Sequence, residues 1–172
     1  MKVGTRSLLF GVHQVLIHPV GVALAWRRLY GRPGWRVLVC IFIHDWGYWG
    51  LANMDGEEGE DHPETGAGIA GWLFGAEYRD LCLLHSRHYA RAAGVAPSRL
   101  CWADKMSILY EPWWFYLGRA WLSGELFEYR RNCEKAGVFP GRGSHRAWFE
   151  WLRGRLVKLG EERRGDAVEY HG

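Results

Sequence analysis

The chain has 172 residues, of which 48% are hydrophobic and 24% are charged, and its formal net charge is +3. This length and composition predict a single folded globular domain and exclude an intrinsically disordered chain. The small net charge argues against a nucleic-acid partner or an anionic membrane surface. The four cysteines include no Cys-x-x-Cys pair, so we expect reduced thiols and a cytoplasmic protein.

An apolar stretch over residues 7–26 has the length of a membrane span. It is interrupted by His13, Gln14, His18 and Pro19, which favours a buried amphipathic segment. We therefore expect no membrane partner.

Helix start and stop residues recur along the chain, and no sustained strand alternation is present. Pro33 and Pro63 stand where a first-turn proline is tolerated, and Gly31 and Gly75 stand where helices commonly end. The predicted helices cover residues 19–30, 33–45, 63–75, 77–93, 97–111, 113–121 and 146–159, and an acidic, glycine-rich loop covers 47–61. We predict an all-α, compact helical bundle of about six or seven helices.

Histidine and aspartate residues lie at the ends or on shared faces of these predicted helices. They are His18, His44, Asp45, His62, His85, His88 and Asp104. Imidazole and carboxylate groups are ligands that divalent transition metals prefer, and a helical bundle can bring them together. Each of these residues alone is more often structural, but the ordered set predicts a metal site.

Three segments of the chain resemble the HD-domain superfamily of metal-dependent phosphohydrolases. HDWGYWG at 44–50 resembles the family's His-Asp doublet and glycine turn, DHPETGAGIA at 61–70 its His-Pro-Glu helix start, and WADKMS at 102–107 its Ala-Asp-Lys motif. The resemblance covers residues 13–120 and is specific only as a set. Tyr48 departs from it, because the family variants with an HDxGK motif carry a lysine at this position.

The resemblance implies an HD-type helical domain over residues 1–125, with 126–172 as a C-terminal helical extension packed on the same domain. It further implies that His18, His44, Asp45 and Asp104 hold one metal ion. His62 and His85 would complete a second site bridged by Asp45, with His88 as a less favoured candidate ligand. The ligand types do not distinguish Mn, Fe, Co, Ni and Zn, nor one ion from two.

A divalent ion lowers the pKa of a bound water from ~15.7 towards ~7, so the expected activity is hydrolysis of a phosphoester or phosphoanhydride. We expect Asp45, Lys105 and Arg87 to be catalytic, and Lys105, Arg87 and Arg91 to bind a small phosphorylated substrate, possibly a nucleotide. Arg87 and Arg91 have an equally good interpretation as solvated surface residues.

Two other functions fit the same residues. Similar His/Asp sets in the superfamily hold two iron ions and activate dioxygen, and a third possibility is a noncatalytic, metal-stabilised interaction domain. Trp114, Leu117 and Trp121 share one predicted helix face, which favours core packing or a homodimer contact over a ligand platform.

Overall fold

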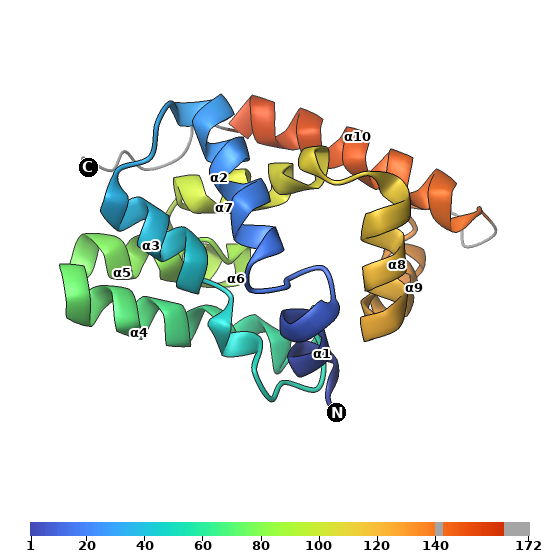
Figure 1. Cartoon of the computed structure of the whole chain (residues 1–172), viewed down its shortest axis with the longest axis horizontal. Helices are drawn as coiled ribbons and strands as arrows, with labels where there is room; N and C mark the ends of the chain where they lie inside the picture. Colours follow the sequence, from blue (N-terminus) through green and yellow to red (C-terminus); the bar gives the residue numbers. More distant parts are fainter. Residues whose placement is uncertain (140–142, 164–172) are drawn as a thin grey trace.

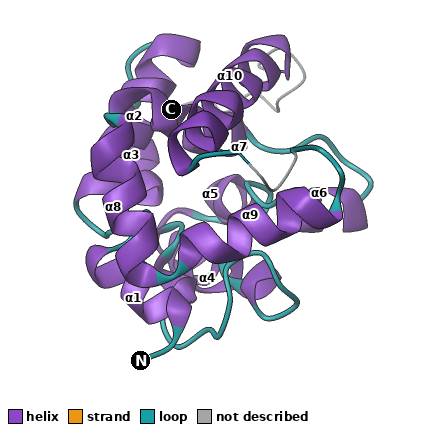
Figure 2. Cartoon of the chain, turned by 90° about the vertical axis from the view of Figure 1, so that its right-hand side faces the viewer, coloured by secondary structure: helices purple, strands orange, loops and turns teal. Residues whose placement is uncertain are grey.

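The computed structural model describes residues 1–139 and 143–163, and these residues form helices, turns and loops without a strand (Figures 1 and 2). The α-helices are α1 (Val3–Phe10), α2 (Ile17–Tyr30), α3 (Trp35–Ile43), α4 (Pro63–Phe74), α5 (Ala76–Leu83), α6 (Arg87–Ala92), α7 (Arg99–Met106), α8 (Trp113–Ser123), α9 (Glu125–Lys135) and α10 (His145–Arg163). Three short 3-10 turns are η1 (Trp46–Tyr48), η2 (Gly59–Asp61) and η3 (Ser107–Tyr110). In the part of the chain described, no helix is both long and apolar enough to cross a membrane.

The predicted helix boundaries agree with the structure where proline and glycine mark them. Pro63 opens α4 in its first turn, and Gly75 ends that helix with a φ of 93°. This left-handed conformation is open to glycine without the steric penalty that other residues meet. The all-α prediction is confirmed for the described residues.

The predicted helix count is too low, because ten α-helices are present in the described residues. The single helix predicted over 77–93 is divided between α5 and α6. The backbone leaves the helical path at Leu84, and the Ser86 hydroxyl then accepts a hydrogen bond from the N–H of His88, which caps α6. Two further helices, α1 and α9, were not predicted, and both bury only a few residues.

Two hydrophobic clusters make up most of the core. One joins α2, α3, α4, α5 and α7, and the other joins α8, α9 and α10 with Val12 and Ile108. Helix α10 packs against both α7 and α8, so the C-terminal segment lies over the rest of the bundle (Figure 1). The domain boundary predicted after residue 125 falls in the first turn of α9.

Most of the tryptophans do not build the core, contrary to the expectation for the aromatic run in α8. Trp114 and Trp121 are 61% and 57% exposed, whereas Leu117 between them is buried. The buried stripe of α8 instead follows Tyr116, Leu117 and Ala120. The core prediction for these two tryptophans is therefore wrong, and the homodimer contact stays a prediction.

Candidate metal centre

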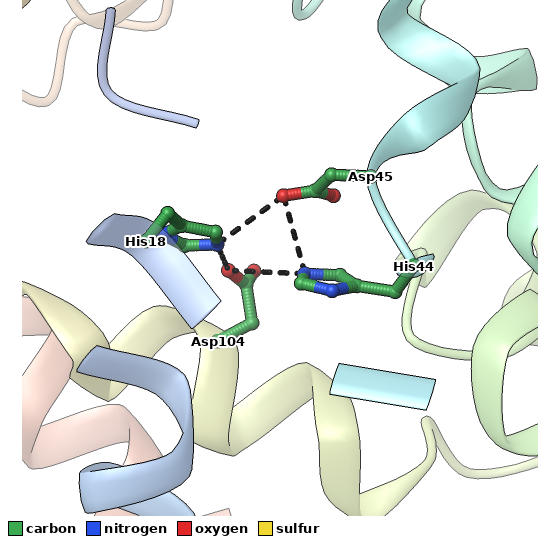
Figure 3. Close-up of side chains that lie close together, drawn as sticks. All are labelled: His18, His44, Asp45 and Asp104. Atoms are coloured by element: carbon green, nitrogen blue, oxygen red, sulfur yellow. Dashed lines mark ion pairs between the residues drawn. The ribbon is translucent and has the colours of Figure 1, made fainter. Parts of the chain in front are cut away.

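Four of the predicted ligands meet in the interior of the bundle, where α2, α7 and the end of α3 converge. The Nε2 atom of His18 lies 3.2 Å from Asp45 Oδ2 and 3.0 Å from Asp104 Oδ1 (Figure 3). The Nε2 atom of His44 lies 3.2 Å and 3.9 Å from the same two oxygens. These atoms are close enough together to hold one metal ion.

A second group of ligand atoms lies on the other side of the Asp45 carboxylate. Its Oδ1 atom is 3.8 Å from His62 Nε2 and 3.6 Å from His85 Nε2, and these two nitrogens are 3.0 Å apart. Asp45, His62 and His85 form a second set that could hold an ion. Asp45 thus directs one oxygen to each group, which is the arrangement of a carboxylate that bridges two ions.

Glycines allow the segments that carry these ligands to pack closely. A Cβ atom on Gly66 of α4 would lie 2.6 Å from the Ile43 carbonyl oxygen and 2.8 Å from the His44 Cα. A Cβ atom on Gly47 would lie 2.0 Å from the His62 carbonyl oxygen. Any larger residue at these positions would force the two backbone segments apart. The two glycines therefore allow the His-Asp doublet to pack against the start of α4.

Backbone carbonyls fix the orientation of three of the four histidine rings. The Nδ1–H of His44 donates to the Ile41 carbonyl at 2.7 Å, and that of His62 donates to the Gly59 carbonyl at 2.6 Å. His85 donates from Nδ1 to the Cys82 carbonyl in the same way. A carbonyl oxygen only accepts, so Nδ1 carries the proton in the neutral form of each ring. Nε2 then has the free lone pair that a metal-bound histidine requires.

The first group contains buried polar atoms that the protein leaves unsatisfied. His18 Nε2, His44 Nε2 and Asp45 Oδ2 have no hydrogen-bond partner, although both nitrogens lie within ion-pair distance of that oxygen. Buried polar groups are nearly always paired, and an unpaired one costs free energy. A divalent cation between these atoms would satisfy all of them, so the residues present fit a metal ion.

The charges of the first group also fit a cation. Burial opposes protonation, but the carboxylates of Asp104 and Asp45 raise the pKa of His18 to about 9. Burial likewise opposes protonation of His44, yet Asp45 and Asp104 raise its pKa to about 10. Burial would raise the pKa of Asp45, but His44 and His18 hold it well below its usual range. This group therefore attracts positive charge, which a metal ion can supply in place of protons.

His62 differs from these two histidines, because it stays neutral. Burial and the neighbouring His85 lower the pKa of His62 to about 3. The Tyr48 ring stacks on the His62 ring at 4.1 Å with an angle of 8°. Burial and the charge of Asp45 raise the pKa of Tyr48 well above its usual range, so this phenol stays uncharged.

A cavity of about 450 Å³ opens over the candidate metal ligands. Lys105, Arg87 and Arg91 line it, as does His88, which belongs to neither ligand group. Within the described residues, none of the three basic side chains forms an ion pair, although Arg91 Nε donates to the Arg87 carbonyl at 3.1 Å. The acidic loop contributes Asp55 and Glu60 to the wall of the cavity.

Sequence reasoning missed His13 and Glu125. Glu125 is fully buried, and one of its oxygens lies 2.9 Å from His13 Nδ1. The His13 ring lies 5.1 Å from the His18 ring and lines the cavity. Neither residue belongs to a recognisable motif, and the only sequence signal was a histidine five positions before His18.

No family model, curated protein or solved structure matches this chain.

Proposed function

We propose that this chain is a metal-dependent phosphohydrolase of the HD-domain type, cleaving a phosphoester or phosphoanhydride of a small phosphorylated substrate. The position of Asp45, with one carboxylate oxygen facing each histidine group, carries this proposal. His18, His44 and Asp104 would complete one metal site, and His62 and His85 the other. This ligand set agrees with the resemblance of the three segments around it.

A bound divalent ion would supply a water acidic enough to ionise near neutral pH and would neutralise phosphate oxygens. The chain's own residues position the substrate. Lys105 follows the ligand Asp104 and lines the cavity, so its ammonium can reach a phosphate oxygen beside the ligands. Arg87 and Arg91 line the same cavity from α6, and a guanidinium can bind a phosphate through two hydrogen bonds.

Anaerobic reconstitution with Mn, Fe, Co, Ni or Zn, followed by phosphate-release assays on a panel of phosphoesters, tests this function. We expect phosphate release that requires metal and that the Asp45→Asn substitution abolishes. Asp80→Asn on the outer surface of α5 is the matched control, since Asp80 pairs only with its neighbour Arg79 in the described chain. Equal activity of the Asp45→Asn variant and the wild type would contradict the proposal.

A di-iron oxygenase is the second candidate, because the same imidazole and carboxylate ligands can also hold iron. Oxygen uptake by the iron-loaded protein without phosphate release from any ester would support this function and overturn the hydrolase. A folded, metal-loaded protein with neither activity would leave the noncatalytic interaction domain as the better interpretation.

A further inference from the structure

The cavity over the metal ligands has a second wall of different chemistry. Seven of its larger aromatic or aliphatic lining residues come from the C-terminal part of the chain: Ile108, Tyr116, Tyr129, Val138, Trp148, Leu152 and Leu156. We call this set the apolar chamber. It is built by η3, α8, α9, the bend after α9 and α10, whereas the candidate metal ligands come from the part of the chain between the start of α2 and the end of α7. In Figure 1, α8 and α9 stand beside the rest of the bundle and α10 lies above both.

The chamber is preformed. Ile108, Tyr116 and Trp148 are buried members of one hydrophobic cluster, and Leu152 and Leu156 pack against it. The Tyr129 hydroxyl donates to Glu125 Oε1 at 3.2 Å, which fixes this ring as well. A wall with so many fixed side chains binds a ligand without first having to be ordered.

The chamber adjoins the metal centre. Tyr129 and His13 both contact Glu125 Oε1, and the His13 ring lies beside the ring of the metal ligand His18. Burial and nearby acids raise the pKa values of Tyr116 and Tyr129 well above the usual range, so both phenols stay uncharged. A ligand held at the candidate metal ligands therefore meets two uncharged phenols and several aliphatic side chains on this side.

We propose that the apolar chamber binds the organic group of the substrate, and that this group carries a flat, largely apolar ring. The inference rests on the proposed phosphohydrolase function, which assigns the phosphate to the metal end. Tyr129, the least buried of the three aromatic side chains, offers a face for ring stacking. A cavity of about 450 Å³ has room for a phosphate and a ring system, since pockets of ~300 to 1,000 Å³ hold ligands of that size.

Two non-hydrolysable phosphonates test the chamber by calorimetry on the Mn-loaded protein. Methylphosphonate has only the acidic group, and 1-naphthylmethylphosphonate adds a double ring. We expect the naphthyl compound to bind at least about 10-fold more tightly, because it buries apolar surface that the methyl compound lacks. Equal affinities would contradict the proposal that the chamber binds the organic group, but they would not contradict the proposed phosphohydrolase function.

Two substitutions test whether the ring of the ligand binds in the apolar chamber. Leu152→Asn puts an amide in the wall, and Val138→Asn does so at a cavity residue that is 38% exposed and tolerates a polar group. Each should weaken the naphthyl compound by about 10-fold and leave methylphosphonate unchanged. Leu122→Asn and Val95→Asn, at exposed positions outside the cavity, are the matched controls. If the Val138 variant folds and binds both compounds as the wild type does, the chamber is wrong.

Two further ligands complete the test. The phosphonate analogue of adenosine monophosphate distinguishes a nucleobase from a hydrocarbon ring, and either ring supports the chamber if it binds more tightly than methylphosphonate. The alcohol 1-naphthol lacks the phosphonate. If 1-naphthol binds and Val138→Asn weakens it, while neither phosphonate responds to the metal, then the chamber is supported and the proposed function fails.

Discussion

Two buried carboxylates in this molecule have opposite surroundings. Glu125 accepts hydrogen bonds from the hydroxyls of Ser7, Ser123 and Tyr129 and from the Val12 N–H, and it pairs with His13. Asp45 lies among histidines, yet its Oδ2 atom has no hydrogen-bond partner. The protein satisfies Glu125 by itself, so this carboxylate holds the fold together. It leaves Asp45 Oδ2 without a partner, as expected of an atom that binds a ligand, and this marks the candidate functional site.

The largest expected effect is on stability at Glu125. Glu125→Ala removes the shared partner of α1, α8 and α9 and leaves several buried donors unpaired. The free energy of unfolding should fall by about 3 to 5 kcal/mol, as for other broken buried charge networks. Urea denaturation measures this, with Glu134→Ala at an exposed position of the same helix as the control. A loss below about 1 kcal/mol would show that the Glu125 network is not structural.

The next effect should come from metal binding to the Asp45 groups. Manganese at 100 times its dissociation constant should raise the free energy of unfolding by about 2.7 kcal/mol, because the ion binds only the folded chain. Asp45→Asn should abolish the increase, since it removes a charge shared by both groups. The comparison between the two carboxylates fails if manganese stabilises the Asp45→Asn variant as much as the wild type.

A smaller effect separates His85 from His88. His85→Ala should weaken the second bound ion by at least about 10-fold, because its Nε2 faces Asp45 and His62. His88→Ala should leave metal binding unchanged, because His88 belongs to neither group. Metal content per chain and calorimetric titration measure both variants. Loss of an ion from the His88 variant alone would reverse this assignment.

The smallest effect concerns the pH dependence of stability. Burial opposes ionisation of Glu125, but His13 and Ser123 lower its pKa below the usual 4.5. The ionised carboxylate therefore stabilises the fold above pH 4.5, and this stabilisation is lost as the pH falls through its lower pKa in the folded protein. Denaturation at several pH values should show a shallower loss of stability below pH 4.5 in Glu125→Gln than in the wild type. An identical slope would contradict the ionised state of Glu125.

Sequence patterns predicted the helical class and the boundaries that proline and glycine mark, such as Pro63 and Gly75 around α4. They failed where local signals are weak. Helices α1 and α9 bury few residues, so the apolar pattern gives them little signal. The break between α5 and α6 depends on hydrogen bonds of the His85 ring and the Ser86 hydroxyl. The spacing of residues in the sequence does not reveal such bonds.

The sequence by itself determined which ligand types are available, because it gives the identity and the spacing of the histidines and aspartates at the helix ends. Only the tertiary structure decided that Asp45 faces two histidine groups, that His88 belongs to neither, and that His13 pairs with Glu125 across 112 residues. It also decided that the C-terminal helices line the same cavity as the metal ligands. Such contacts depend on how distant helices pack, and packing depends on the shapes of all the buried side chains together.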